Sequence, residues 1–324
     1  MNVLCSKCNS PFLIRVSGPV EKNPYDNYDY FSNTILDSTN PTPLVNAGSF
    51  NAKLEYYSPT LSYKDRGMNV LFSYLREQGL LRKSNGFSED SSGNAGASFA
   101  FMCNVLALRG KIYVSQNANK NKLDQIRSYK GEIVTVQGDR KSVEKAAMFG
   151  GETYLGHQYW PEFYDAFRTI SYEIRNQMKE IPENIVIPFS TGTLYLGIFE
   201  GFNHLLMDGK LDKIPTLWAI QPEIASGMYD HLNNIKKDQK RSIADALTGV
   251  LPLRFEYIES IINSTGRCET ITESEIVQAK LSLEKQGIDC EYSSAVTFAA
   301  LKKFNLPNDT LLILTGHGIK NINQ

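Results

Sequence analysis

The sequence lacks any run of eighteen apolar residues, which is about the length that a membrane-spanning helix needs. Residues 1–5 also lack the basic and apolar regions of a signal peptide. Its five cysteines are an odd number in a chain without a secretory signal, so we expect reduced thiols and a cytoplasmic location. The formal net charge is only −1, which argues against nucleic acid or another polyanion as a partner.

The chain is also poor in clustered metal ligands. Cys5 and Cys8 resemble one knuckle of a zinc ribbon, but a structural zinc site needs four ligands, usually as two such pairs. The other cysteines and the four histidines are scattered singly. We therefore expect no bound metal and interpret residues 1–16 as a vestigial knuckle or a short turn.

What the sequence does contain is an alternation of strand-like and helix-like segments, which is typical of a parallel sheet covered by helices on both faces. With 324 residues the chain is long enough for two lobes. We predict a small lobe over 64–160 and a large lobe over 17–63 and 161–324. Residues 226–270 give no clear pattern. The expected strands are 52–56, 111–115, 132–136, 184–189, 216–220 and 310–314, and the expected helices after the first are 94–108, 119–129, 141–149, 194–206, 272–286 and 293–304.

Lys64 falls at the start of the first predicted helix, whose apolar residues run to 75 and whose C-cap is Gly79. The dipole of a helix disfavours a cation at this end, and neutral lysines are the ones that form Schiff bases with carbonyl compounds. The alternative is an ordinary surface lysine. Three further polar segments, at 90–96, 190–194 and 315–318, strengthen the first interpretation because ligands of open α/β sheets bind near such segments.

One of these segments, composed of Ser190, Thr191, Gly192, Thr193 and Leu194, opens a predicted helix. Backbone amides at a helix start can hold a phosphate, and a plain helix cap is the alternative. Because the segment lacks the lysine of a Walker loop, a nucleoside triphosphate is disfavoured.

The other two segments offer polar side chains to a ring. Asn94 could donate its amide to a ring oxygen, or it could simply cap a helix. Thr315 follows an apolar strand, and its hydroxyl could bond a pyridine nitrogen without protonating it, or it could be an edge residue. Together the four segments supply an amine, an anion site and ring contacts, which suit a cofactor that carries an aldehyde and a phosphate.

These motifs resemble those of the fold-type II pyridoxal-phosphate enzymes, and within them the threonine synthases. The segment SYKDRG at 62–67 is similar to the Schiff-base motif, and EDSSGNAGAS at 89–98 to the ring-contact motif. The segment STGTLYLG at 190–197 is similar to the phosphate loop, and TGHGIKN at 315–321 to the C-terminal motif. A fifth segment, GIDCEYSSA at 287–295, also resembles one of the family. The likeness spans roughly residues 40–320 in the family's order.

The resemblance implies an α/β fold of two lobes, each a mostly parallel sheet flanked by helices, with pyridoxal 5'-phosphate as the cofactor. It implies that Lys64 binds the cofactor and shuttles protons, that Asn94 contacts the ring oxygen and that Thr315 contacts the ring nitrogen. The backbone of residues 190–194 would bind the phosphate.

The resemblance also implies a site for the substrate. Ser91, Ser92 and Gly93 would bind the carboxylate of an amino acid at a helix start. Arg66 and Arg168 are candidate partners for a substrate phosphate, and structural ion pairs are the alternative for both.

The leading expected reaction converts O-phospho-L-homoserine and water to L-threonine and phosphate. However, residues 156–162 lack the Asn- and Arg-containing pattern that threonine synthases use for the substrate phosphate. Three alternatives therefore stay open: β-replacement on phosphoserine, a serine or threonine ammonia-lyase, and a non-catalytic binding protein. A small phosphorylated amino-acid substrate and a homodimer are the partners that the resemblance implies, with no nucleic acid and no membrane.

Overall fold

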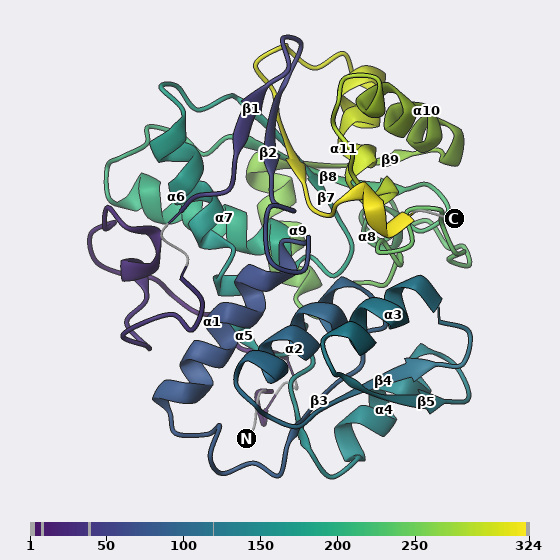
Figure 1. Cartoon of the computed structure of the whole chain (residues 1–324). Coiled ribbons are helices and arrows are strands. Elements are labelled where there is room, and N and C mark those ends of the chain that lie inside the picture. The colour runs from purple at the N-terminus through teal and green to yellow at the C-terminus, as the bar shows by residue number, and fades with distance from the viewer. Residues whose placement is uncertain (1–3, 8–9, 38–39, 119, 322–324) are drawn as a thin grey trace. The chain divides into compact units, whose positions relative to one another are not determined.

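The computed structural model contains two compact units (Figure 1). The residues that it describes are 4–7, 10–37, 40–118 and 120–321. Unit 1 comprises Met1–Ile14, Tyr25–Thr39 and Ser58–Ala166, and unit 2 comprises Arg15–Pro24, Asn40–Tyr57 and Phe167–Gln324. Each unit has its own sheet. Each unit is also assembled from three separate stretches of the chain.

Unit 1 is built on a four-stranded parallel sheet in the order β5-β4-β3-β6. Its strands are β3 (Phe87–Glu89), β4 (Gly110–Ser115), β5 (Glu132–Val136) and β6 (Thr153–Tyr154). Its helices are α1 (Lys64–Glu77), α2 (Asn94–Val105), α3 (Lys120–Ser128), α4 (Arg140–Phe149) and α5 (Pro161–Asp165), and η1 (Pro24–Asn27) is a short 3-10 helix. Figure 1 shows α3 above this sheet and α4 below it, and the central strand β3 is buried along its whole length.

The first helix begins at Lys64, as the sequence predicts. Its apolar residues at helical spacing are fully buried, and they pack against the neighbouring helices α2 and α5. The predicted terminating glycine is also confirmed, because Gly79 follows the C-cap Gln78 with a φ of +65°, a left-handed conformation that glycine adopts without steric cost.

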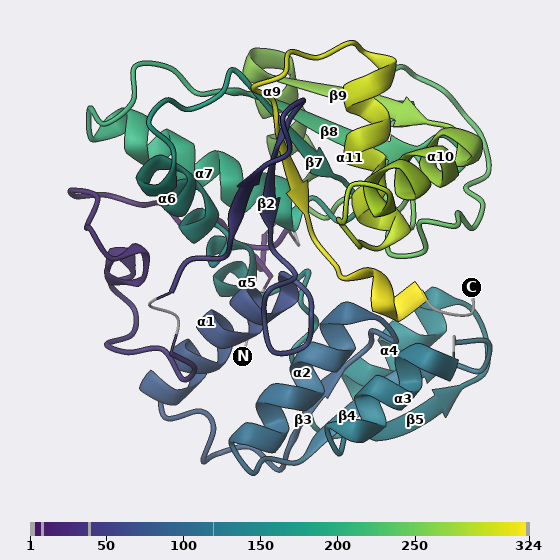
Figure 2. The ribbon, with the colours of Figure 1, turned by 45° about the horizontal axis from the view of Figure 1, so that its top comes forward.

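Unit 2 is built on a six-stranded sheet in the order β1-β2-β10-β7-β8-β9, in which only the β1–β2 pair is antiparallel. Its strands are β1 (Leu44–Asn46), β2 (Asn51–Leu54), β7 (Asn184–Pro188), β8 (Thr216–Pro222), β9 (Gly266–Ile271) and β10 (Leu311–Leu314). Its helices are α6 (Arg168–Gln177), α7 (Thr193–Met207), α8 (Gly227–Leu232), α9 (Phe255–Thr265), α10 (Glu273–Glu284) and α11 (Tyr292–Lys303), followed by the 3-10 helix η2 (Gly318–Asn321). Figure 2 shows α10 and α11 in front of the strands, where they cover one face of the sheet. The two helix-covered sheets confirm the predicted α/β class.

The register of the large sheet brings two of the polar segments to one edge. Strands β7 and β10 are parallel neighbours, with Leu311 opposite Ile185. Because the carboxyl ends of adjacent parallel strands meet at the same edge, Ser190 and Thr315 follow neighbouring strand ends.

Local signals in unit 2 account for some elements and miss others. Thr272 and Glu275 form a capping box at the start of α10, within the helix that the sequence predicts over 272–286. Residues 226–270, which give no clear sequence pattern, contain α8, α9 and most of β9. β9 lies at the edge of the sheet and is only partly buried, so it lacks the apolar run of a central strand.

Two negative expectations concern parts of the chain that the structure describes. No helix within residues 4–7, 10–37, 40–118 and 120–321 is both long and apolar enough to cross a membrane. No group of three or more His, Cys, Asp or Glu side chains within those ranges is arranged to bind a metal. Cys8 lies outside them, so the vestigial knuckle with Cys5 stays a prediction.

Candidate active site

Lys64 is a buried lysine whose amine faces aromatic rings instead of an acid. The residue is 9% exposed, and its Nζ lies 4.6 Å from the ring centre of Tyr63 and 5.4 Å from that of Phe163. Among the described residues, no group forms a hydrogen bond or an ion pair with this nitrogen. A buried amine that no carboxylate holds is available to a ligand.

Gly67 makes room for one of these rings. A Cβ atom at this position would lie 2.5 Å from the ring of Phe163, so no other residue fits without a shift of the ring. Gly67 lies one turn beyond Lys64 on α1, and Phe163 belongs to α5. The glycine of the SYKDRG motif therefore lets α5 pack tightly against the start of α1.

A buried acid and a buried histidine lie next to each other at the end of β3. Nδ1 of His157 is 2.9 Å from Oε1 of Glu89, and the backbone N–H of His157 donates to Oε2 at 3.2 Å. Burial raises the pKa of Glu89 to about 7, and the pKa of His157 lies well below its ordinary value, because of burial first and the charge of Lys64 second. Burial therefore disfavours the charged form of each residue, and the contact between them is a hydrogen bond between neutral groups when Glu89 is protonated.

The next residue, Asp90, is fixed by a cation and a phenol. Nη2 of Arg140 lies 2.6 Å from Oδ2 of Asp90, and the hydroxyl of Tyr154 donates to Oδ1 at 2.9 Å. Burial, followed by the nearby charge of Glu89, raises the pKa of Asp90. Arg140 also donates to the backbone carbonyl of Asp90. These bonds hold the strand end immediately before the turn to which the family resemblance gives the substrate carboxylate.

That turn is compact and lies at the start of α2. The N–H of Gly93 donates to Oγ of Ser91 at 3.3 Å, and all three turn residues, including Ser92, are half-buried. A Cβ on Gly96 would lie 1.8 Å from the carbonyl oxygen of Ser91, so the turn requires glycine there. Asn94 is the first residue of α2, and α2 packs against α1. Lys64 and Asn94 thus begin two packed helices of unit 1, and the turn immediately precedes Asn94.

Arg66 shares the first turn of α1 with Lys64 and is 8% exposed. Its burial distinguishes it from a solvated surface arginine. The role in binding a substrate phosphate stays a prediction, as do the other substrate contacts.

The second polar region, in unit 2, is the loop between β7 and α7. Gly192 has a φ of +75°, and a Cβ there would lie 2.4 Å from Cδ1 of Ile258. No side chain caps α7. Within the described part of the chain, no carbonyl or side chain accepts a hydrogen bond from the amides of residues 190–194. Oγ of Ser190 instead accepts from the N–H of Thr248 at 3.2 Å. The loop therefore presents open amide donors at a helix start, which suit an anion.

Thr315 lies at the end of β10 and is held by a serine. Its Oγ1 is 3.0 Å from Oγ of Ser294, and its N–H donates to the same oxygen at 2.9 Å. The N–H of Gly316 donates to Ser294 as well, at 3.1 Å. Ser294 belongs to the GIDCEYSSA segment at 287–295. The family resemblance of this segment did not predict a role for the serine.

Arg168 lies in a directed chain of hydrogen bonds elsewhere in unit 2. It is 1% exposed and donates to the hydroxyl of Tyr172 at 3.0 Å, which contacts Nδ1 of His204 at 2.8 Å. Nε2 of His204 contacts the carbonyl of Gly18 at 3.0 Å. Burial lowers the pKa of His204, which favours a neutral ring with its proton on Nε2. These contacts connect the N-terminal segment to α6 and α7, and a substrate role for Arg168 stays a prediction.

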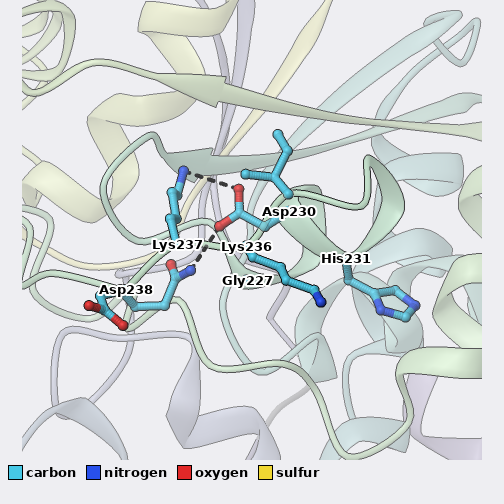
Figure 3. A pocket seen from close by; sticks show the side chains of 8 residues that line it. Gly227, Asp230, His231, Lys236, Lys237 and Asp238 are labelled. Carbon is cyan, nitrogen blue, oxygen red and sulfur yellow. Dashed lines mark hydrogen bonds and ion pairs between the residues drawn. The ribbon is translucent and has the colours of Figure 1, made fainter.

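A cavity in unit 2 has none of the predicted site residues in its lining (Figure 3). It measures about 590 Å³ and lies beside α8. At its centre the carboxylate of Asp230 accepts from Lys237 at 3.0 Å and from Gln239 at 2.8 Å. Because its acid is satisfied by its own neighbours, the cavity is not a candidate for the chemistry that the motifs indicate.

Comparison with known proteins agrees with the motifs. A family model described as pyridoxal-phosphate dependent enzyme matches residues 35–316. Threonine synthase of Methanocaldococcus jannaschii is 29% identical, over 83% of this chain and 70% of that protein. Threonine synthase of Methanosarcina acetivorans is 25% identical, over 99% of this chain and 82% of that protein. A biosynthetic L-threonine dehydratase of Mycobacterium tuberculosis is 24% identical, over 91% and 72%.

Solved structures are similar in fold. Maize serine racemase superposes with a TM-score of 0.72 at 20% identity, covering 86% of this chain and 88% of that chain. The processed threonine deaminase isoform 2 from Solanum lycopersicum gives 0.73 at 19% identity, covering 98% and 91%. At these identities the likeness concerns the fold.

Proposed function

Because the chain belongs to the family of pyridoxal-phosphate-dependent enzymes, we propose that it catalyses an elimination or replacement reaction on an amino acid. The leading reaction converts O-phospho-L-homoserine and water to L-threonine and phosphate. The observation that carries this proposal is the set of threonine synthase relatives, one of which aligns with 99% of the chain. The cofactor is pyridoxal 5'-phosphate.

The residues present fit this cofactor. Lys64 offers a buried amine that no described acid holds, and it would hold the cofactor covalently. The open amides of residues 190–194 at the start of α7 would hold the phosphate. Asn94 and Thr315 would contact the ring oxygen and the ring nitrogen. When bound, the cofactor draws electrons away from the bonds at the α-carbon of the amino acid.

The chain's own groups then manage the charge and the protons of the substrate. Ser91, Ser92 and Gly93 would bind the α-carboxylate with hydroxyl and amide donors at the start of α2. Nζ of Lys64 would take the proton from the α-carbon and return it during the later steps. The two ring faces beside this nitrogen keep water from it.

A second candidate is an ammonia-lyase that acts on threonine or serine. Two observations favour it over other members of the family. The L-threonine dehydratase of Mycobacterium tuberculosis is among the relatives. The 156–162 segment, where threonine synthases bind the substrate phosphate, is engaged internally here, with His157 on Glu89 and Tyr159 on Glu144. Phosphoserine β-replacement is a third reaction open to the same groups, and a non-catalytic binding protein is the remaining alternative.

The deciding experiment offers the purified, cofactor-loaded protein four compounds in turn: O-phospho-L-homoserine, L-threonine, L-serine and O-phospho-L-serine. We expect stoichiometric phosphate and threonine from the first. Formation of a 2-oxo acid from threonine or serine without turnover of phosphohomoserine would assign the lyase reaction instead. Turnover of none of the four, together with a bound cofactor, would favour the binding protein.

The assembly and the location are part of the proposal as well. We expect a homodimer in the cytoplasm, in line with the sequence analysis. Light scattering coupled to size-exclusion chromatography would give about twice the chain mass of 36.4 kDa, and a peak at the mass of one chain would contradict the dimer.

A further inference from the structure

We propose that Ser294 is a positioning residue that fixes the hydroxyl of Thr315 as a hydrogen-bond donor. The inference rests on the proposed function in one respect, since it takes the ring nitrogen of the cofactor as the acceptor. The bonds that carry it all lie within unit 2, between α11 and the residues that follow β10.

The bonds of the Ser294 hydroxyl determine the direction of its contact with Thr315. A serine oxygen can accept two hydrogen bonds and donate one. Oγ of Ser294 accepts from the N–H of Thr315 at 2.9 Å and from the N–H of Gly316 at 3.1 Å. Both of its acceptor positions are therefore filled. The contact between Oγ of Ser294 and Oγ1 of Thr315, at 3.0 Å, then has only one consistent direction, in which Ser294 donates.

The competing acceptor is less favourable. The carbonyl of Gly316 lies 3.4 Å from Oγ of Ser294, which is longer than the contact to Thr315. That carbonyl already accepts from the N–H of Glu291 at 2.8 Å, a bond that holds the start of α11 against the residues after β10. The hydroxyl proton of Ser294 is therefore best placed on Thr315.

The consequence falls on Thr315. Its Oγ1 receives the proton of Ser294, so the hydroxyl proton of Thr315 itself must go to another acceptor. Thr315 is 5% exposed and Ser294 is fully buried, so water competes little for these bonds. A hydroxyl that accepts from Ser294 keeps its own proton for another acceptor, so it can donate to an unprotonated ring nitrogen.

A neighbouring hydroxyl on α11 offers a matched control. Oγ1 of Thr297, one turn further along α11, donates to the backbone carbonyl of Ser294 at 2.8 Å. Thr297 is also fully buried, and this bond does not reach Thr315. It therefore provides a matched control, since replacing it removes a buried hydroxyl from the same helix and leaves the Ser294–Thr315 contact in place.

The test is ¹⁵N NMR of the full chain loaded with pyridoxal phosphate that carries ¹⁵N at its ring nitrogen. We compare the wild type with Thr315→Val, Ser294→Ala, the double variant and the control Thr297→Val. We expect Thr315→Val to move the ring resonance toward that of a nitrogen without a hydrogen bond. Ser294→Ala should move it the same way by a smaller amount, and the double variant should match Thr315→Val. Thr297→Val should leave it unchanged.

The outcomes separate the two levels of the proposal. A resonance that moves in Thr315→Val and stays in Ser294→Ala would overturn the role of Ser294 and leave the ring contact of Thr315 intact. A resonance that stays in Thr315→Val would overturn the ring contact itself and, with it, the inference. Equal movement in Thr297→Val and Ser294→Ala would show a general loosening of α11 and would also count against Ser294.

Ser294→Ala leaves two backbone amides without an acceptor, so the variant could fail to fold. Ser294→Cys covers that case, because a thiol is a weak acceptor and a weak donor of similar size. We expect a resonance between those of the wild type and Thr315→Val, with cofactor binding weakened roughly two- to tenfold, as the loss of one good hydrogen bond predicts. A resonance identical to that of the wild type would overturn the proposal.

Discussion

The surroundings of Lys64 in unit 1 and those of Thr315 in unit 2 are built from opposite kinds of polar group. The charge of Lys64 acts on the Glu89–His157 pair, whose groups titrate, and Asp90 follows Glu89 in the chain. Thr315 is held by a hydroxyl, and its neighbouring backbone amides bond to the same hydroxyl, which does not change charge near neutral pH. One region can exchange protons, whereas the other offers fixed dipoles.

This difference indicates a division of labour within the proposed mechanism. Groups that titrate suit the steps in which a proton moves at the substrate. Fixed donors suit the parts of a cofactor that keep their charge throughout, such as a phosphate or a neutral ring nitrogen. We therefore expect substitutions near Lys64 to change the pH dependence, and substitutions near Thr315 and Gly192 to change affinity at every pH.

The largest effect should come from Lys64→Ala. Losing both the covalent link and the proton shuttle should lower the turnover of O-phospho-L-homoserine by about 10²- to 10⁴-fold or more. The absorbance band of the bound cofactor should also disappear after dialysis. Lys145→Ala is the control, because Lys145 is an exposed lysine of the same unit. Normal turnover and a retained absorbance band in Lys64→Ala would contradict the role of Lys64, and the comparison between its surroundings and those of Thr315 would then lose its basis.

The next effect concerns the carboxyl of Glu89 and is measured on stability. The pKa of Glu89 is raised in the folded state from 4.5 to about 7, so folding favours its protonated form. Its contribution is fully present below pH 4.5 and is lost as the pH rises toward 7, by an amount of about 3 kcal/mol. In Glu89→Gln this loss should be absent, so the free energy of unfolding should depend less steeply on pH between 4.5 and 7.

The partner of Glu89 acts with the opposite sign. The pKa of His157 is lowered in the folded state, so its contribution is present above about pH 6.5 and falls at lower pH. Glu132→Gln is a suitable control, since Glu132 is an exposed carboxylate of the same unit. If Glu89→Gln and Glu132→Gln gave the same pH profile as the wild type, the region near Lys64 would not differ from a solvated surface.

A smaller effect tests the fixed donors of unit 2. Gly192→Ala forces a side chain onto a residue with φ +75° and places its Cβ 2.4 Å from Ile258. We expect a loss of about 2 kcal/mol in the free energy of unfolding and weaker cofactor binding that does not vary with pH. Gly209 has a φ of +67° with no neighbour within 4 Å, so Gly209→Ala should cost about 1 kcal/mol and leave cofactor binding unchanged. Equal cofactor affinity in the two variants would contradict the role of the 190–194 loop.

The sequence predicted the features that depend on nearby residues. The start of α1 at Lys64, the glycine at 79 and the helix that begins at about 272 all follow from local spacing and were confirmed. The central strands of unit 2 were predicted within one or two residues, because strands buried on both faces are nearly continuous apolar runs.

The features that were missed depend on residues far apart in the chain. Glu89 and His157 are 68 residues apart, and no local sequence pattern predicts that they form a hydrogen bond with each other. Ser294 and Thr315 were both within recognised segments, yet their contact requires α11 to pack beside β10. The strands β1 and β9 lie at the edges of the sheet, where partial exposure removes the apolar pattern. Two consecutive acids at the end of a strand, as at Glu89 and Asp90 after β3, are the one local signal that could have indicated a buried acidic site.

The smallest effect sharpens the comparison, because it concerns a group of unit 2 that does titrate. His204 is neutral in the series of hydrogen bonds that runs from Arg168 through Tyr172 to Gly18, and burial lowers its pKa below 6.5. The unfolded chain therefore binds a proton before the folded one does, and the stability that His204 contributes falls as the pH drops below about 6.5. In His204→Asn this part of the fall should be absent, so the midpoint of thermal unfolding should change less between about pH 7.5 and about pH 5.5 than in the wild type. The affinity for the cofactor should change with pH equally in both proteins, because the bonds of His204 go to Tyr172 and Gly18 and not to Thr315 or the 190–194 loop. A change in the pH dependence of cofactor binding would show that unit 2 also couples proton uptake to its ligand.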